Sequence, residues 1–393
     1  MKRTISDVDL KGKRILMRAD FNVPLANVGG YVTVADDYRI REALATIRAI
    51  RTAGGRLAIC AHLGRPKGER TPELSLEPVA RQLSELVEIP VGFVDECVGE
   101  KVRSAVNALG DGDVVLLENT RFHPEEKQND ADFAARLAEP FDLFVNDAFG
   151  AAHRAHASTV GVTDSLPSAQ GLLMQREVEA ITGVTESPEK PFVVILGGAK
   201  VSDKIGVVRA LASRADAILT GGGMANTILA ARGAELGTSL VETDAMEEVH
   251  AIDREFGSRV YVPVDLVVAD EIAEGAQTET VHAERVPPGK AAGDIGPETL
   301  ERYREILGDA RTVVWNGPMG VFELERFAEG TNRTAEILAG LDATVVCGGG
   351  DSAAAVRSGG YADRLTHVST GGGAFLELIE HGSLPGIDAI DDA

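Results

Sequence analysis

Two lysines that follow a glycine turn are the clearest candidates for phosphate chemistry in this sequence. Phe192–Leu196 is a β-branched, apolar run that predicts a buried parallel strand, and it ends in Gly197-Gly198. Lys200 and Lys204 follow, four residues apart, and share one face if a helix begins here. Free N–H groups and the macrodipole at a helix N-terminus favour anions, so the stretch predicts a phosphate site. The alternative is an ordinary turn with two solvated lysines.

Glycine turns recur through the second half of the chain. Apolar runs end in glycines within 217–226, 312–320, 344–352 and 366–374. Asp351 follows one of these turns, where a carboxylate could hold Mg²⁺ carried by nucleotide phosphates, because Mg²⁺ favours one or two protein carboxylates with phosphate and water. A helix N-cap formed by Asp351 or Ser352 is the alternative. Gly371-Gly372-Gly373 would offer backbone N–H groups to a transferring phosphoryl oxygen.

Basic and polar side chains follow the expected strands of the first half instead. These candidates are Asp20, Asn22, Arg39, His62, Arg65, Arg121, His123 and Arg154. Singly, each arginine is typical of a surface or a salt bridge, and His62 could be a buried structural histidine. Together, in an acidic chain, they indicate a positive site for a small phosphorylated carboxylate, because guanidinium groups bind carboxylate and phosphate oxygens in bidentate fashion.

Metal and disulfide chemistry is not favoured. His153 and His156 lack the glutamate and spacing of a zincin motif, and hydrogen-bonding histidines near the positive site are expected instead. The three cysteines lie far apart without C-x-x-C spacing, which indicates a reducing, cytoplasmic environment.

The elements that must position these residues follow a βαβ pattern. Short apolar runs alternate with longer amphipathic segments, as in a parallel sheet covered by helices. In the first half the strands are expected within 14–22, 56–66, 114–123 and 143–150. Ligands of open α/β sheets bind outside the carboxyl ends of strands. At 393 residues, with a basic half and a glycine-rich half, the chain is expected to form two domains that hold two substrates.

The border between the domains is expected between Val160 and Pro191. A breaker cluster at 165–168 precedes an expected helix at 172–182, and 185–191 is a second expected exposed break. The short acidic tail, 383–393, is expected to be loosely held.

Composition excludes several classes of partner. The net charge of −22 and an aromatic content of 5% argue against nucleic acid, which is bound through cationic and stacking side chains. The N-terminus lacks the apolar core of a signal peptide, and no apolar run reaches the ~20 residues that span a bilayer. The excess of 61 acidic over 39 basic residues suggests adaptation to concentrated salt.

Three common signatures are absent. The sequence contains no G-x-x-x-x-G-K-[ST], no G-x-G-x-x-G and no G-x-S-x-G. A P-loop enzyme, a dinucleotide-binding dehydrogenase and a serine hydrolase are therefore not favoured.

The chain resembles the phosphoglycerate kinase family in motifs that span Arg18 to Ala374. In order, they are RADFNVP, AHLGRP, ENTRFH, NDAFGAAHRAH, LGGAKVSDKI, GGGMAN, WNGPMGVFE, GGGDS and STGGGA. The resemblance implies reversible phosphoryl transfer between 1,3-bisphosphoglycerate and Mg-ADP, giving 3-phosphoglycerate and Mg-ATP, in glycolysis and gluconeogenesis. It also implies direct in-line transfer after lobe closure, in a cytoplasmic monomer.

The implied fold is α/β, with two doubly wound, Rossmann-like parallel-sheet lobes joined by a hinge helix. The implied domains are a phosphoglycerate-binding lobe (1–168), an interlobe helix and linker (169–188), a nucleotide-binding lobe (189–372) and a C-terminal segment that returns to the first lobe (373–393).

The resemblance also implies roles for residues of the matching motifs. Phosphoglycerate would be bound by Asp20, Asn22, Arg39, His62, Arg65, Arg121 and Arg154. The nucleotide would be bound by Gly198, Lys200, Lys204, Gly221, Asn316, Glu323, Gly350, Asp351 and Ser352, with Mg²⁺ on Asp351. Arg39, Lys200 and the Gly371-Gly372 backbone would surround the phosphoryl group during transfer.

Two residues depart from the family pattern. Ser352 stands where threonine is usual, and Asn226 replaces the aromatic residue of many members. Two other functions stay open at this point. An NAD-dependent dehydrogenase would share the architecture but lacks its fingerprint, and a non-catalytic nucleotide-binding regulator would have no need of the positive site.

Overall fold

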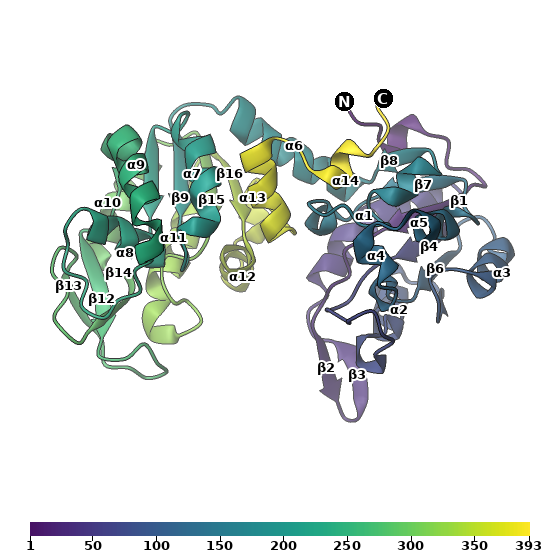
Figure 1. Cartoon of the computed structure of the whole chain (residues 1–393), viewed down its shortest axis with the longest axis horizontal. Helices are drawn as coiled ribbons and strands as arrows, with labels where there is room; N and C mark the ends of the chain where they lie inside the picture. The colour runs from purple at the N-terminus through teal and green to yellow at the C-terminus, as the bar shows by residue number, and fades with distance from the viewer. The chain divides into compact units, whose positions relative to one another are not determined.

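The computed structural model describes residues 1–393, and the chain divides into two compact units. Unit 1 comprises Met1–Val178 together with Ser383–Ala393, and unit 2 comprises Glu179–Gly382. Each unit contains its own six-stranded sheet with helices packed on it (Figure 1).

The sheet of unit 1 is entirely parallel, with strand order β5-β6-β4-β1-β7-β8. Its strands are β1 (Arg14–Arg18), β4 (Arg56–Cys60), β5 (Val91–Val94), β6 (Val114–Leu117), β7 (Leu143–Asn146) and β8 (Ser168–Gln170). The central strands are buried on both faces, which explains why their sequences are continuous apolar runs and do not alternate.

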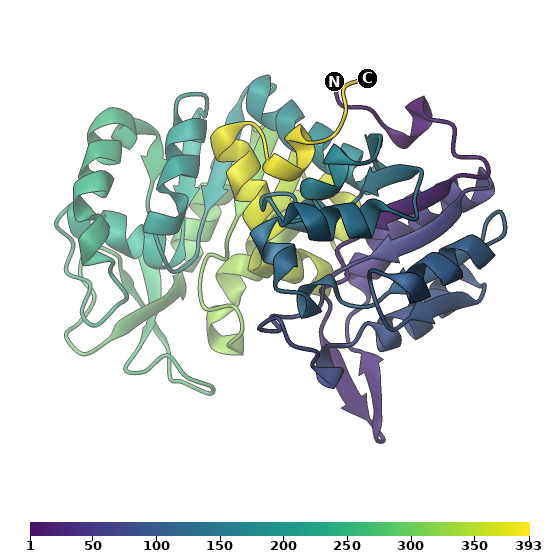
Figure 2. The same ribbon diagram turned by 45° about the vertical axis from the view of Figure 1, so that its right-hand side comes forward.

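Helices form an apolar core on each face of this sheet. One core contains Ile47 of α1 and Leu83 of α2, and the other contains Val102 of α3 and Phe133 of α5. The helices of the unit are α1 (Tyr38–Thr52), α2 (Glu77–Val87), α3 (Glu100–Ala108), α4 (Glu125–Gln128), α5 (Ala131–Ala138) and α14 (Pro385–Asp388). A hairpin of β2 (Leu25–Val28) and β3 (Tyr31–Val34) projects from the unit in both ribbon views (Figures 1 and 2).

Unit 2 contains a second parallel sheet, with strand order β11-β10-β9-β15-β16-β17. Its strands are β9 (Phe192–Leu196), β10 (Ala217–Thr220), β11 (Val260–Tyr261), β15 (Thr312–Asn316), β16 (Thr344–Gly348) and β17 (His367–Val368). The chain adds strands on one side of β9 and then on the other, so the order reverses between β9 and β15. In open α/β sheets this reversal is the point where ligands bind.

Most helices of unit 2 lie between successive strands of the chain, and the last one follows the last strand, β17. The helices are α7 (Ile205–Ala212), α8 (Gly222–Ala231), α9 (Met246–Phe256), α10 (Pro297–Gly308), α11 (Glu329–Ala339), α12 (Gly350–Ser358) and α13 (Gly372–His381). A separate antiparallel sheet of β12 (Asp265–Ala269), β13 (Glu279–His282) and β14 (Ala291–Ile295) has its own small core.

The division between the units falls inside α6 (Leu172–Glu186), within the segment predicted to link the domains. The helix is longer than the predicted 172–182. Thr185, expected in an exposed break, is buried near its end and donates to the Ile181 carbonyl at 2.9 Å. The hydroxyl thus forms a hydrogen bond inside the helix that the composition of 185–191 did not indicate.

The C-terminal segment joins unit 1 at Ser383, ten residues later than the predicted 373. Residues 372–381 form α13, whose buried Phe375 and Leu378 keep it in unit 2. The expectation of a loosely held tail is wrong. Ile387 and Ile390 are buried, and Asp391 pairs with Arg3 at 3.1 Å, so the two chain ends lie side by side (Figure 1).

Candidate functional sites

Polar side chains gather at the carboxyl ends of β1 and β4 in unit 1. The buried Asp20 carboxylate accepts a hydrogen bond from Arg39 Nη1 at 2.7 Å, which makes this the closest ion pair among the predicted residues. Asn22 Oδ1 accepts from the Gly64 N–H at 2.8 Å, and Arg121 Nη1 donates to the Gly64 carbonyl at 2.9 Å. The predicted residues of three strand ends are therefore connected through one loop.

His62 is buried beside Arg18, the last residue of β1. Its Nδ1 lies 3.0 Å from Arg18 Nη2. Because a guanidinium group can only donate, Nδ1 accepts, and the neutral ring carries its proton on Nε2. Burial, and then the charge of Arg18, lowers the pKa of His62 well below its usual range. His62 is therefore a neutral donor at neutral pH.

A buried chain of hydrogen bonds fixes the orientation of Arg18. Arg18 Nε donates to Ser158 Oγ at 2.8 Å, and that hydroxyl donates to Glu126 Oε1 at 2.6 Å. All three side chains are buried. These positions were not predicted as site residues. The signal that could have identified Arg18 is an arginine that ends an otherwise apolar strand, whereas Glu126 and Ser158 have no comparable signal.

Positive charge accumulates around His62. Burial, followed by the charges of Arg18 and Arg154, lowers the pKa of Arg121 to about 10. Arg121 Nε and His156 Nδ1 are buried without a hydrogen-bond partner. Arg65 and Arg154 are exposed, and Arg154 Nε donates to His153 Nε2 at 2.9 Å. Such an excess of cations and unpaired ring and guanidinium nitrogens is suited to an anionic ligand. We call this group, centred on His62 and Arg121, the basic site.

The two lysines of unit 2 have different surroundings. The structure contradicts a shared helical face, because a short 3-10 turn (Ser202–Lys204) precedes α7. Lys204 Nζ donates to the carbonyls of Gly197 at 2.6 Å and Asn316 at 3.2 Å, and burial lowers its pKa to about 8. Lys200 is exposed and makes no hydrogen bond or ion pair. Lys204 thus bridges the ends of β9 and β15.

Glycine is required where the chain turns after β9. A Cβ atom at Gly197 would lie 1.9 Å from the Pro318 carbonyl oxygen, so no side chain fits there. The N–H groups of Gly198 and Gly221 donate to the carbonyls of Pro318 and Leu196. The N–H groups of these two predicted nucleotide-binding residues therefore already have partners within the protein.

The N-termini of α12 and α13 meet at the carboxyl end of β16. A Cβ atom at Gly372 would lie 3.2 Å from the Gly350 nitrogen. Gly349 is the N-cap of α12, so neither Asp351 nor Ser352 caps the helix, and Asp351 is exposed.

The other predicted residues at this edge are already hydrogen-bonded. The buried Ser352 hydroxyl and the Asn316 amide both donate to the Gly348 carbonyl, at 2.6 and 2.9 Å. The Gly371 N–H donates to Ser369 Oγ at 3.2 Å. In this structure Ser352 and Asn316 stabilise the turn that presents Gly350 and Asp351.

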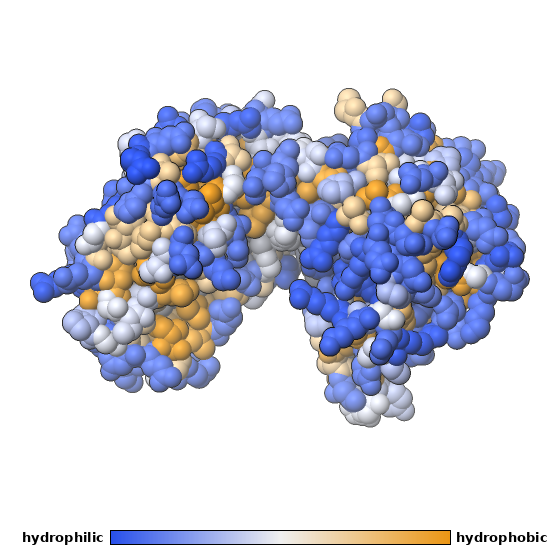
Figure 3. Space-filling view, viewed as in Figure 1, coloured by the Kyte–Doolittle hydropathy of each residue, from blue (hydrophilic) through white to orange (hydrophobic).

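A pocket of about 240 Å³ opens beside these turns in unit 2. Three of the predicted nucleotide-binding residues, Gly198, Glu323 and Asp351, line it. Leu240 and Val321, the exposed large hydrophobic residues of unit 2, line it as well. Figure 3 shows apolar surface on the side of unit 2 that carries β12 and β14. A mixed apolar and acidic lining beside helix N-termini suits a nucleotide. We call this cavity the nucleotide pocket.

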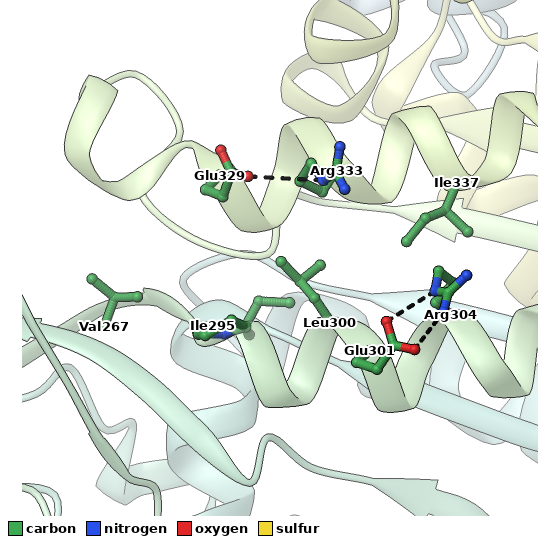
Figure 4. A pocket seen from close by; sticks show the side chains of 9 residues that line it. Val267, Ile295, Leu300, Glu301, Arg304, Glu329, Arg333 and Ile337 are labelled. Carbon is green, nitrogen blue, oxygen red and sulfur yellow. Dashed lines mark hydrogen bonds and ion pairs between the residues drawn. The ribbon is translucent and has the colours of Figure 1, made fainter.

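A different cavity of about 380 Å³ lies between α10 and α11 (Figure 4). It contains none of the predicted site residues. Its charged side chains pair with each other, Arg304 with Glu301 and Arg333 with Glu329. Their charges are therefore satisfied within the protein.

No dedicated metal centre is present. The structure has no group of three or more His, Cys, Asp or Glu side chains that could hold a metal ion. The single exposed carboxylate of Asp351 in the nucleotide pocket nevertheless fits Mg²⁺ that arrives with nucleotide phosphates, since such an ion needs only one or two protein carboxylates.

Two parallel-sheet units, one with a basic anion site and one with a pocket beside glycine turns, define an α/β phosphotransferase. The chain matches the family model described as phosphoglycerate kinase over residues 5–382. It is 52% identical to the phosphoglycerate kinase of Rubrobacter xylanophilus and 51% identical to that of Pelotomaculum thermopropionicum. Both matches cover 100% of this chain, and 98% and 99% of the two relatives. The chain belongs to the phosphoglycerate kinase family.

Solved structures agree with this assignment. The phosphoglycerate kinase of Coxiella burnetii superposes with a TM-score of 0.88 at 38% identity, covering 99% of this chain and 98% of that one. That of Pyrococcus horikoshii gives 0.86 at 33% identity, with 98% of each chain covered. The predicted fold class is confirmed. The chain is a glycolytic, ATP-generating kinase, and the dehydrogenase and regulator alternatives are not favoured. None of its helices is both long and apolar enough to cross a membrane.

Proposed function

We propose that unit 1 binds the phosphoglycerate and unit 2 binds the nucleotide in the reversible transfer of a phosphoryl group between 1,3-bisphosphoglycerate and Mg-ADP. The main support for assigning the two substrates to different units is the contrast between the two sites. The basic site concentrates cations and unpaired ring and guanidinium nitrogens, whereas the nucleotide pocket offers apolar walls, acidic side chains and helix N-termini.

In unit 1, the proposed ligands of phosphoglycerate share a position at or near the carboxyl edge of the sheet. They are Asp20, Asn22, Arg39, His62, Arg65, Arg121 and Arg154. The His62 Nε2–H can donate to a substrate oxygen because Arg18 occupies Nδ1. Arg121 Nε is a buried donor that lacks a partner, and an anionic oxygen would supply one.

In unit 2, the proposed ligands surround the nucleotide pocket and the glycine turns. They are Gly198, Lys200, Lys204, Gly221, Asn316, Glu323, Gly350, Asp351 and Ser352. Glu323 lines the pocket as an exposed acceptor, which suits ribose hydroxyl groups. Lys204 is anchored by two carbonyls and suits a phosphate that stays with the nucleotide. Asp351 would hold Mg²⁺, which neutralises phosphate charge when bound.

The transfer itself needs no covalent enzyme intermediate. A phosphate oxygen of ADP and the carboxylate oxygen of phosphoglycerate exchange the phosphoryl group in line, so one P–O bond forms as the other breaks. Arg39, Lys200 and the Gly371-Gly372 backbone would neutralise the charge that spreads over the transferring oxygens. Because the two substrates bind to different units, the units must bring them together and exclude water.

A coupled assay with 3-phosphoglycerate and Mg-ATP tests the division of substrates. Arg121→Ala should raise the KM for 3-phosphoglycerate with little effect on the KM for Mg-ATP. Asp351→Asn should weaken Mg-ADP binding and leave metal-free ADP binding nearly unchanged. The proposal would be contradicted if Arg121→Ala raised the KM values of both substrates equally, or if Asp351→Asn weakened ADP binding equally with and without Mg²⁺. We also infer a cytoplasmic monomer, which sedimentation at several protein concentrations and fractionation of cells would test.

A further inference from the structure

Asn226 has a carboxamide without a hydrogen-bond partner in the protein. It lies in the second turn of α8, is 4% exposed, and lines the nucleotide pocket. Its carboxamide makes no hydrogen bond to the protein, and neither of its polar atoms is fully buried, so both reach the solvent of the pocket. The hydroxyl of its neighbour Thr227, by contrast, donates to the Gly223 carbonyl at 2.8 Å and accepts from the Glu242 N–H at 3.1 Å. The carboxamide is therefore available to a bound ligand, whose hydrogen bonds can replace those of water in the pocket.

Asn226 differs from the other polar side chains of the pocket lining in its hydrogen-bonding groups. Apart from backbone groups, the other polar residues that line the pocket are Glu323 and Asp351, and an ionised carboxylate can only accept. Asn226 is the side chain of this lining that can donate and accept at once. That combination is needed to match a heterocycle whose edge carries both kinds of group.

The position of Asn226 along α8 separates it from the phosphate end of the pocket. Gly222 and Gly223, which also line the pocket, begin the helix, and Asn226 follows about one turn later, roughly 5 Å further from the N-terminus. Leu240 and Val321, 57% and 37% exposed, supply apolar surface to the same pocket. A planar base fits against such surface, whereas phosphates are favoured at the helix N-termini.

We propose that the Asn226 carboxamide recognises the hydrogen-bonding edge of the nucleobase. This inference rests on the proposed binding of the nucleotide in this pocket. The amide oxygen and NH₂ match the 6-amino group and adjacent ring nitrogen of adenine. Turned over, the same amide matches the O6 and N1–H of guanine. Asn226 can therefore pair with either adenine or guanine.

Replacement of Asn226 by aspartate should favour guanine over adenine. A carboxylate at 226 accepts from the N1–H and 2-amino group of guanine but faces the ring nitrogen of adenine with a second acceptor. Asn226→Asp should therefore lower the ratio of kcat/KM for Mg-ATP to that for Mg-GTP by roughly ten-fold, the scale of one or two hydrogen bonds. Asn226→Leu, of similar size, should lower kcat/KM for both nucleotides by roughly ten-fold, mainly through KM.

The experiment compares wild type, Asn226→Asp, Asn226→Leu and Leu240→Ala at saturating 3-phosphoglycerate, with calorimetric titration of ADP and GDP. Leu240→Ala is the matched control, because loss of an apolar contact should weaken both purines equally and leave their ratio unchanged. An unchanged ratio in Asn226→Asp, together with normal affinities in Asn226→Leu, would overturn the inference. If Asn226→Asp does not fold, the Asn226→Leu affinities decide.

The role of Asn226 and the binding of nucleotide in this pocket can be tested separately. If the wild-type protein transfers phosphoryl groups but purine preference ignores residue 226, only the role of Asn226 is lost. If mutations at both 226 and 240 leave ADP binding intact, the nucleotide does not occupy this pocket and the proposed function of unit 2 is wrong.

Discussion

At the scale of single residues, Lys200 and Lys204 are only four positions apart but have different surroundings. Lys204 is held by two carbonyls at the meeting point of β9 and β15, while the ammonium group of Lys200 is free in solvent. A compact charge on a flexible stem can follow a phosphoryl group between oxygens, and an anchored charge cannot. We therefore propose that Lys200 acts in phosphoryl transfer and Lys204 in nucleotide binding.

Lys200→Ala should chiefly depress kcat, and Lys204→Ala should chiefly raise the KM for nucleotide. Contacts formed only in the transition state affect kcat, whereas uniform binding affects KM. Both variants are assayed at saturating 3-phosphoglycerate over a range of Mg-ATP, with thermal unfolding as a control for lost support of the Gly197 turn. A larger loss of kcat in Lys204→Ala would reverse the two assignments.

His62 should make stability depend on pH. Its pKa is lowered on folding, so its contribution is present above the unfolded value of about 6.5 and is lost as pH falls below it. Burial raises the pKa of Asp294 to about 7, so Asp294 has the opposite effect on stability. The folded protein keeps this proton at pH values where the unfolded chain has lost it, so stability falls as pH rises from the ordinary value of 3.8 toward 7. The difference between wild type and His62→Gln isolates the histidine.

That difference should shrink toward acid pH by up to about 1.4 kcal/mol per pH unit below pH 6.5, the limit for one proton. Denaturant unfolding of both proteins from pH 5 to 8 measures it. Parallel curves over this range would mean that His62 keeps its usual pKa and that its pairing with Arg18 does not hold the ring neutral.

At the scale of elements, strands that carry strong apolar runs were predictable. Eight of the nine predicted runs correspond to the central strands of the two sheets and the ninth to the edge strand β17, and their glycine or polar ends supplied most of the candidate residues. The strands that were missed are short or amphipathic. β8, β11, β13 and β14 lack continuous apolar runs, the four-residue β5 is interrupted by a glycine, and the β2–β3 hairpin is largely exposed, so hydrophobic periodicity gives little signal there. β12 does contain an apolar run, LVVA, but was missed as well.

The sites were predictable to the level of residue type but not of contact. Strand-end arginines and glycines pointed to two anion sites, yet the chain from Glu126 through Ser158 and Arg18 to His62 joins distant segments and has no local pattern. The later start of α7 also escaped prediction, because a 3-10 turn and an α-helix share the same composition.

The C-terminal segment should contribute strongly to unit 1. Ile390 is 1% exposed, so Ile390→Ala is expected to destabilise the protein by about 2–5 kcal/mol through lost burial and a cavity. Asp392→Asn is the control, because the Asp392 side chain, which pairs with Lys2 at 3.2 Å, is mostly exposed and should contribute little. Unfolding midpoints that are the same for both variants would show that the segment is only weakly attached.

At the scale of the whole molecule, the net charge of −22 should matter in dilute buffer. Self-repulsion destabilises the compact state, and salt screens it within a few tenths molar. The thermal midpoint should therefore rise most steeply between zero and about 0.2 M KCl, whereas salting effects on apolar burial continue to grow at molar concentrations. A midpoint that is flat below 0.2 M would end the idea that the acidic surface is a salt adaptation.

The assembly of unit 1 from both ends of the chain has a consequence for synthesis. Translation delivers residues in order, and domains generally fold as units while the chain grows. All of Glu179–Gly382 has been made before Ser383–Ala393, which unit 1 needs for its full set of contacts. Release from the ribosome, and not the emergence of Val178, is then the moment at which the first half of the chain can finish folding. A message truncated just before the Ser383 codon would produce a complete second unit attached to an unfinished first one.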